Sequence, residues 1–343
     1  MFIHAPLLHV PLVLPLLPLL SERCGRICAS ASSNIFALDF DGVLCDSESE
    51  LTRSAWRAAC ELWPDVMARA SEMAEEPWRA GARGSWTGGD WEQLQGIGPD
   101  DLPNWLAFKM KALRPHVETG YESLLLIRLC VDEALAAQRA SSSGARPLTP
   151  GEIGANWGDM RDVLLARYAL PQQKAIETLG AARDAWIESD PEDWLGANSF
   201  YPGVIEAVRA AVADGSADVH IVTTKQRRFA QELMRSAGLE LDDAHIFGLG
   251  SGPKVQTLRA LQQAHPSSAL SFVEDRVQTL RTVANEPSLF GCHLYFATWG
   301  YSDSEQRAAA ASMPRVRTLS RSDELAELLA GQRSSSADWR ERE

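Results

Sequence analysis

Cysteine is scarce in this chain of 343 residues, which has only six, at Cys24, Cys28, Cys45, Cys60, Cys130 and Cys292. Small secreted scaffolds that depend on disulfides are much denser in cysteine, so the sequence excludes that class. Apart from Cys24 and Cys28, which are four residues apart, no pair has the spacing of a metal site. We therefore expect reduced thiols that are mostly buried.

Positive charge is also in deficit, with 33 Lys and Arg against 46 Asp and Glu and a net charge of -13. An acidic surface repels nucleic-acid phosphates and anionic membranes, so we expect neither partner. A small anion stays compatible if its pocket supplies local positive charge. Hydrophobic residues make up 45% and charged residues 23% of the chain, a balance that supports a globular core.

An uninterrupted apolar helix is missing at the N-terminus as well. Residues 2–20 are almost all apolar, but four prolines interrupt them, so a membrane-spanning helix is not expected. The stretch that follows is rich in Ser, Ala and Arg, and Glu22 is its one acid. Such leaders are typical of organelle targeting, so we predict a chloroplast transit peptide at residues 1–34. A mitochondrial, secretory or cytoplasmic location is the alternative.

Beyond the leader, the apolar pattern changes twice. Residues 35–39 form a short apolar run that predicts a buried strand. Residues 48–199 contain long stretches with apolar residues three and four apart, which predict helices. After residue 200, short apolar strands alternate with helices. We therefore predict an α/β fold: a doubly wound parallel sheet built from residues 35–47 and 200–331, with a large inserted helical domain at 48–199 and a disordered tail at 332–343.

Acidic side chains follow the first predicted strand, in the run Asp39-Phe40-Asp41. Ligands of open parallel sheets bind beyond the carboxyl ends of the strands, and alternation places both acids on one side. Two close carboxylates suit Mg²⁺, or a nucleophile beside a general acid or base. Such pairs also occur in turns and at helix N-caps, so the pair alone does not decide.

Three further signals stand at successive ends of predicted elements. Thr223 ends the second predicted strand, Lys254 opens a helix, and Glu274 and Asp275 end a later strand. Helix capping explains the threonine or Asp275 equally well, and Lys254 alone could be a solvated surface residue. A lysine at a helix N-terminus opposes the helix dipole, however, which is easier to understand if it faces an anion. The ordered series therefore predicts one site for a metal and an anion.

This series resembles the haloacid dehalogenase-like hydrolase superfamily. The matching segments are ALDFDGVLCDSE, IVTTK, GPKVQTL and FVEDR, and YPGV resembles the return from the cap that this family inserts after its first motif. More narrowly, RPHVETGYE, FVEDRVQTL and LYFATWGY are similar to a branch of uncharacterised hydrolases from plants, algae and cyanobacteria. That branch would agree with a plastid leader.

The resemblance implies a role for each motif residue. Asp39 would be the nucleophile that forms an aspartyl-phosphate, and Asp41 would protonate the leaving group and then activate water. Thr223 and Lys254 would hold the phosphoryl oxygens. An acid at Asp41 favours phosphate chemistry over dehalogenation. Many members carry another acid where this chain has Thr279, and the adjacent Glu274–Asp275 pair would substitute for it, with Glu274 as a nearby ligand or an outer-shell acid. The implied Mg²⁺ ligands are Asp39, Asp41, Asp275 and Glu274.

The resemblance also implies that the inserted domain is a cap that closes over the substrate and sets specificity. Arg114 could bind a second anionic group bidentately, with a helix-terminal salt bridge as the alternative. Glu122 lies in the same segment, and Trp299 and Tyr301 could line the entrance, although such aromatics are more often packing residues. The predicted substrate-binding residues are Gly42, Thr224, Arg114, Glu118 and Tyr121.

The function expected from the sequence is a Mg²⁺-dependent phosphatase acting on a small phosphorylated metabolite, similar to phosphoglycolate or a sugar phosphate. A phosphoglucomutase-like isomerase would have the same core motifs, because only the acceptor of the phosphoryl group differs. A non-catalytic regulatory protein on the same fold is the third alternative. An apolar helical cap is also compatible with a homodimer.

Overall fold

The structure is a computed structural model that describes residues 34–73, 99–140 and 146–331. The predicted tail at 332–343 lies outside the described residues, and so does the predicted leader except for Asn34.

A six-stranded parallel sheet forms the core, in the order β5-β4-β1-β6-β7-β8. The central strand β1 pairs with β4 on one side and with β6 on the other. Its four-residue run of buried side chains is typical of a central parallel strand. The strands are β1 (Asn34–Leu38), β4 (Asp218–Val222), β5 (Ile246–Phe247), β6 (Ala269–Glu274), β7 (His293–Ala297) and β8 (Val316–Leu319).

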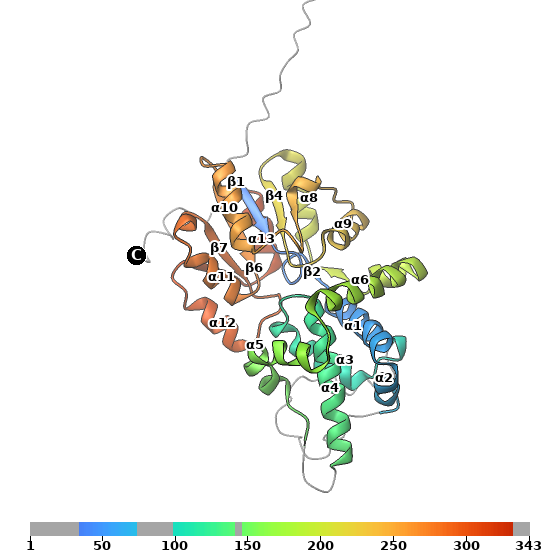
Figure 1. The fold of residues 1–343 in the computed structure, drawn as a ribbon. Coiled ribbons are helices and arrows are strands. Elements are labelled where there is room, and N and C mark those ends of the chain that lie inside the picture. Colours follow the sequence, from blue (N-terminus) through green and yellow to red (C-terminus); the bar gives the residue numbers. More distant parts are fainter. Residues whose placement is uncertain (1–33, 74–98, 141–145, 332–343) are drawn as a thin grey trace, which may run out of the picture. The chain divides into compact units, whose positions relative to one another are not determined.

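Helices cover both faces of this sheet (Figure 1). Phe36 and Leu38 pack with residues of α8, α9 and α13, whereas Ile35 and Ala37 pack with residues of α10, α11 and α12. The alternation along β1 therefore serves two separate apolar layers, and the predicted doubly wound α/β core is confirmed. The six helices are α8 (Val204–Asp214), α9 (Arg227–Ser236), α10 (Lys254–Ala264), α11 (Val277–Ala284), α12 (Ser304–Ala311) and α13 (Ser322–Leu329).

A helical insertion, here called the cap, interrupts the core between β2 and β3. These two short strands pair antiparallel, so the chain leaves the core and returns to it side by side. In Figure 1 the cap helices gather together on one side of the core sheet. The elements are β2 (Cys45–Asp46), α1 (Glu48–Leu62), α2 (Pro64–Ser71), α3 (Asn104–Leu113), α4 (Tyr121–Arg139), α5 (Pro150–Arg167), α6 (Gln172–Ser189), α7 (Pro191–Gly196) and β3 (Ser199–Phe200).

The cap has an apolar core of its own. The long helix α4 buries thirteen of its residues, and α1, α3, α5 and α6 pack around it. Local signals fix the start of α5. Thr149, the residue before the helix, forms a reciprocal capping box with Glu152, and Pro150 is the first residue of the helix. The cap is thus a packed helical body that can present a defined surface to the core.

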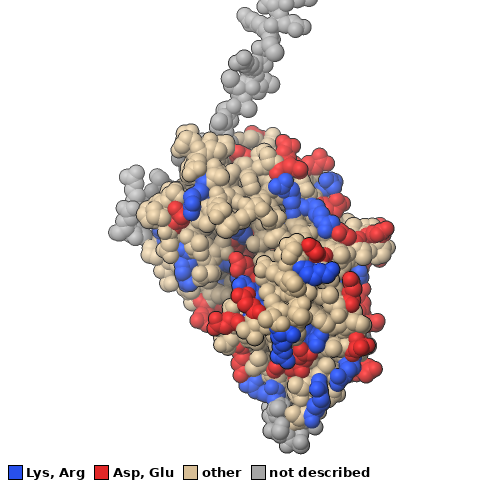
Figure 2. All heavy atoms as spheres, viewed as in Figure 1, with Lys and Arg blue, Asp and Glu red and all other residues tan. Residues whose placement is uncertain are grey.

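Other features of the described residues concern thiols and surface charge. Cys45, Cys60, Cys130 and Cys292, the described cysteines, form no disulfide. Acidic and basic side chains are interspersed over the face drawn in Figure 2. Within the described ranges, no helix combines the length and the apolar character that crossing a membrane requires.

Candidate active site

The predicted motif residues meet at the carboxyl ends of three neighbouring strands. The register pairs Leu38 with Ile221 of β4 and with Val273 of β6, so β1, β4 and β6 end at one edge of the sheet. Asp39 and Thr223 are the first residues after β1 and β4, and Asp275 follows β6. The fold therefore assembles groups that are far apart in the sequence.

Lys254 links two of the predicted acids. Its Nζ lies 2.8 Å from Asp39 Oδ2 and 2.7 Å from Glu274 Oε2. The other oxygen of Glu274 accepts backbone N–H bonds from Asp275 at 3.1 Å and Arg276 at 3.0 Å. Burial opposes the charge on Lys254, but the two carboxylates raise its pKa above the ordinary value. Both oxygens of Glu274 are thus engaged, and this residue holds Lys254 against Asp39.

Asp39 and Asp275 are buried carboxylates whose pKa values are raised. Burial is the main cause that raises the pKa of Asp39 to about 7 and the pKa of Asp275 to about 6. Asp275 Oδ2 accepts a hydrogen bond from the Tyr301 N–H at 2.7 Å. One carboxylate oxygen from each of Asp39, Glu274 and Asp275 lies within 4.8 Å of the others. Buried carboxylates this close favour either a shared proton or a cation.

Asp41 belongs to a second charged group. Its partners Lys225 and Ser47 were not predicted from the sequence. Its Oδ1 accepts from Lys225 Nζ at 3.1 Å and from Ser47 Oγ at 2.5 Å. Burial alone would raise the pKa of Asp41, but Lys225 and Arg114 hold it below the ordinary value. The carboxylate of Asp41 is therefore held ionised by cations of this chain.

Lys225 also contacts a buried ion pair of the cap, formed by Glu50 and Arg183. Glu50 Oε2 lies 3.6 Å from Lys225 Nζ, and the Glu50 carboxylate binds the Arg183 guanidinium bidentately, at 2.6 and 2.9 Å. Burial opposes ionisation, yet Arg183 and Lys225 lower the pKa of Glu50 to about 2. This pair connects α1 and α6 of the cap to the Asp41 side of the site. Lys225 stands two residues after Thr223, and that position was its only signal in the sequence.

Thr223 is oriented by the same loop. Its Oγ1 accepts the Lys225 N–H at 3.1 Å, and its own N–H donates to Phe247 O at 2.9 Å. A hydroxyl that already accepts one bond keeps its proton for another acceptor. The arrangement therefore leaves Thr223 able to donate to an anionic oxygen, as predicted from its place after the strand.

Gly42 allows the first motif to approach Asp275 closely. Its φ is +87°, and a Cβ at this position would lie 2.0 Å from Asp275 Oδ2 and 3.0 Å from the Tyr301 ring. Both the left-handed backbone and the lack of space require glycine. Gly42 thus shapes the carboxylate site.

Replacement of Gly42 by Ala is expected to displace Asp275 and to weaken divalent-cation binding by at least about tenfold, because the new methyl group overlaps a carboxylate oxygen. Calorimetric titration with Mg²⁺ measures the change. Gly291→Ala is the matched control, since nothing lies within 4 Å of the Cβ it would add. Equal Mg²⁺ affinity in the two variants would contradict the crowding argument.

Two adjoining spaces open around these groups. A cavity of about 40 Å³ lies where the cap meets the core, and a neighbouring groove of about 420 Å³ shares Glu118, Thr224 and Arg276 with it. Thr223 and Lys254 line the groove rather than the cavity. The predicted residues that line the cavity are Asp39, Asp41, Asp275, Arg114, Glu118, Tyr121 and Thr224.

Arg114 is the cation that the cap contributes to the cavity. It begins η3 (Arg114–His116), is 8% exposed, and stacks 3.8 Å from the centre of the Tyr301 ring. Its Nη1 donates to Val117 O at 3.2 Å, while its Nε is buried without a hydrogen-bond partner. Among the described residues, Arg114 has no ion-pair partner, so the helix-terminal salt bridge that the sequence left open is not formed there.

The cap is closed onto the core through backbone carbonyls of the segment after α3. Thr224 Oγ1 donates to Glu118 O at 2.7 Å, and Arg276 Nη1 donates to Val117 O at 2.6 Å. Tyr301 adds a contact to the start of the cap, since its hydroxyl donates to Asp46 Oδ1 at 2.7 Å. The Thr224 hydroxyl thus donates its hydrogen bond to the cap. The small cavity is the space that remains between the cap and the core at this point.

The remaining predicted residues have structural roles in this state. Tyr121 is buried in the apolar core of the cap, although its edge reaches the cavity. Glu122 accepts from the Glu118 N–H and from Trp157 Nε1, which orders the start of α4. Trp299 donates to Val43 O and packs against the core.

No protein-family model and no curated protein matches this chain. Among solved structures, the chain is similar to a predicted phosphatase from Clostridium acetobutylicum, with 14% identity, a TM-score of 0.45, and coverage of 87% of this chain and 98% of that one. A predicted phosphoglycolate phosphatase from Haemophilus somnus 129pt has 14% identity and a TM-score of 0.46, over 88% of this chain and 98% of that one.

Proposed function

We propose that this chain is a phosphatase of the haloacid dehalogenase-like superfamily, which hydrolyses a small phosphorylated metabolite through an aspartyl-phosphate on Asp39. The observation that carries the proposal is the contact of Lys254 with Asp39 and Glu274, beside Asp275, at the carboxyl ends of β1 and β6. A nucleophilic carboxylate needs a neighbouring cation to stay ionised when buried, and the same cation can neutralise an incoming phosphoryl group.

Mg²⁺ fits the charge and the ligand type of the site. Four carboxylates, of Asp39, Asp41, Glu274 and Asp275, meet two lysines there, so carboxylates outnumber lysines at the site. Carboxylate oxygens are the ligands that Mg²⁺ prefers. Asp39 and Asp275 would hold the ion, and when bound it supplies positive charge to the phosphoryl oxygens. Glu274 would orient Lys254 rather than replace a ligand.

Each residue of the site has a separate role in the proposed reaction. Asp39 attacks phosphorus, so that a bond from Asp39 to phosphorus forms while the bond from phosphorus to the leaving oxygen breaks. Thr223 and Lys254 donate hydrogen bonds to the phosphoryl oxygens. Asp41, held ionised by Lys225 and Ser47, takes a proton from water in the second step, and that water displaces Asp39 as free phosphate forms. In the first step Asp41 gives a proton to the leaving oxygen, which uses the minor acid form of this residue because Lys225 and Arg114 favour its carboxylate, and the second step returns that proton from water.

The substrate class follows from Arg114. A buried guanidinium without an ion pair, which lines the same cavity as Asp39 and Asp275, favours a substrate that carries a second anionic group besides its phosphate. A small phosphorylated carboxylic acid, similar to phosphoglycolate, carries the two anionic groups that this arrangement would bind. The cap opens to admit it, because the hydrogen bonds to Val117 and Glu118 close the cavity.

Arg114→Gln is expected to raise KM for such a phosphorylated carboxylic acid by about 10- to 100-fold, with a smaller change in kcat, since it removes a charged hydrogen bond made in both ground and transition states. Steady-state kinetics with a phosphomonoester that has no second anionic group provides the comparison, where a smaller change in KM is expected. Arg139→Gln, at the end of α4, is the matched cap control. An equal loss on substrates with and without the second anionic group would contradict recognition of that group by Arg114.

The function itself is tested by phosphate release from a panel of phosphomonoesters, with and without Mg²⁺. Mg²⁺-dependent release, best with a second anionic group, is expected. An isomerase with this core would instead produce a sugar bisphosphate and little free phosphate. A folded chain that neither binds Mg²⁺ nor releases phosphate would contradict the enzyme proposal and favour a regulatory role.

A further inference from the structure

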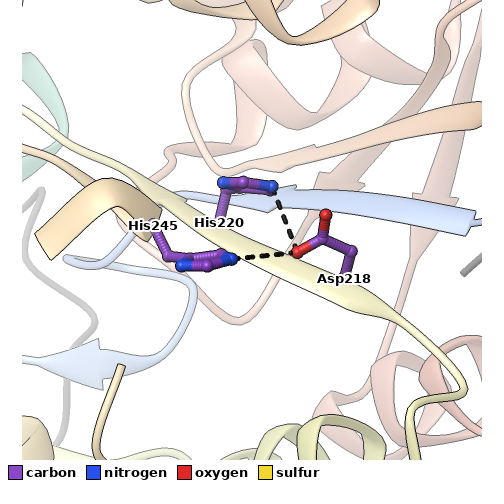
Figure 3. A group of neighbouring side chains, drawn as sticks. All are labelled: Asp218, His220 and His245. Atoms are coloured by element: carbon purple, nitrogen blue, oxygen red, sulfur yellow. Dashed lines mark ion pairs between the residues drawn. The ribbon is translucent and has the colours of Figure 1, made fainter. Parts of the chain in front are cut away.

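A second cluster of metal-ligating side chains lies on the edge of the sheet, away from the carboxylate site. Asp218 and His220 are on β4, and His245 ends η4 (Asp243–His245) directly before β5. The register pairs Ile221 with Ile246, so His220 and His245 precede them on adjacent segments. Alternation puts Asp218 and His220 on one face of β4, and Figure 3 shows the two imidazoles beside the Asp218 carboxylate.

The distances match those between two ligands of one metal ion. His220 Nε2 lies 3.3 Å and His245 Nε2 lies 3.2 Å from the same oxygen, Asp218 Oδ1. Two donors bound to Zn²⁺ at tetrahedral angles, with bonds of about 2.0–2.1 Å, are separated by roughly 3.3 Å. One ligand atom from each of the three residues lies within 4.8 Å of the others.

His220 supplies an independent indication of a ligand. The residue is 5% exposed, and neither Nδ1 nor Nε2 has a hydrogen-bond partner of acceptable geometry. Buried ring nitrogens normally find a partner, because leaving one unsatisfied is costly.

We propose that Asp218, His220 and His245 form a Zn²⁺ site, with water as the fourth ligand. A carboxylate and two imidazoles are a typical zinc ligand set, and they differ from the all-oxygen site at Asp39 and Asp275. The two rings stack with centroids 4.7 Å apart and an interplanar angle of 22°. A bound ion lies near the plane of each ring, so His245 turns to face it, and the 34% exposure of its side chain permits this movement.

The ion would stabilise the pairing of β4 with the short edge strand β5. β5 has only two residues, and two register pairs join it to β4. Beyond these pairs, β4 leads into Thr223, and β5 leads into the segment before Lys254. A metal bridge between His220 and His245 fixes the register of both strands. It thereby positions two residues of the proposed phosphate site without touching the substrate.

The test is titration of the full chain with Zn²⁺ in saturating Mg²⁺, which fills the oxygen site and competes poorly for imidazole. One Zn²⁺ per chain is expected in the wild type. His245→Gln and Asp218→Asn are expected to weaken binding by at least about tenfold, while the control His293→Gln, on β7, keeps the wild-type affinity. Co²⁺ serves as a second probe, because its absorption spectrum reports nitrogen ligands and tetrahedral geometry.

Thermal unfolding keeps the outcome interpretable, because His245 and Asp218 are partly exposed and their variants can be checked for folding without Zn²⁺. Zn²⁺ is expected to raise Tm of the wild type and of His293→Gln, but not of the other two variants. No Zn²⁺ uptake by the wild type, or uptake that both cluster variants retain, would overturn the proposal. Neither result depends on phosphatase activity.

Discussion

Asp39→Asn is expected to lower Mg²⁺-dependent phosphate release by at least about 10³-fold, because the variant lacks the oxygen that attacks phosphorus. Assays of the best substrate from the phosphomonoester panel measure this loss. The variant is expected to fold. Asn has the shape of Asp, burial already raises the pKa of Asp39 to about 7, and Glu274 still pairs with Lys254. Thermal unfolding serves as the control for its structure.

Retention of more than about a tenth of wild-type activity by Asp39→Asn would contradict covalent catalysis at this residue. Asp214→Asn, an exposed carboxylate at the end of α8, is the matched control and should leave turnover unchanged.

Lys254→Met is expected to have the second largest effect, on both turnover and stability. It removes the cation that bonds Asp39 and Glu274, and thus leaves two buried carboxylates without their shared partner. Breaking a buried ion pair costs about 3–5 kcal/mol of unfolding free energy, and losing a donor to the transition state lowers kcat by about 10²–10³-fold. Denaturant unfolding and steady-state kinetics measure the two losses.

The same variant has a pH signature with a defined sign. Lys254 lowers the pKa of Asp39 against the effect of burial, so its removal raises that pKa further above about 7. Residual activity of Lys254→Met should therefore require a more alkaline pH than wild-type activity does, because only ionised Asp39 attacks. Lys174→Met, on the exposed face of α6, is the control. An unshifted pH profile and unchanged stability would refute the role given to Lys254.

Sequence patterns predicted the core because each motif stands next to a strong local signal. Buried runs such as residues 35–38 mark strands, and the order of the sheet then brings their carboxyl ends together. Asp39, Thr223, Lys254 and Asp275 could therefore be grouped without coordinates. The two-residue strands β2 and β3 could not be predicted, since so short a segment has no periodicity.

The charged groups that position the motif residues depend on packing between elements. Glu50 of α1 meets Arg183 of α6 across more than a hundred residues, and only the folded cap brings the pair to Lys225. Thr224 had a hydroxyl suited to a substrate, but the closed cap takes it as a hydrogen-bond donor to Glu118. The local sequence indicates which functional groups are present. Tertiary contacts determine which of them can still bind a substrate.

The central claim is that the phosphoryl group of the substrate is transferred to Asp39. The most direct measurement is detection of the resulting aspartyl-phosphate. An aryl phosphate with a good leaving group needs no acid, so Asp41→Asn should form the phosphoenzyme but hydrolyse it slowly. After acid quenching, peptide mass spectrometry is expected to find a phosphoryl group on the peptide that contains Asp39, and none in Asp39→Asn/Asp41→Asn. Phosphate release by the wild type with no phosphoryl group on Asp39 in the Asp41→Asn variant, or with the group on another residue, would contradict the account.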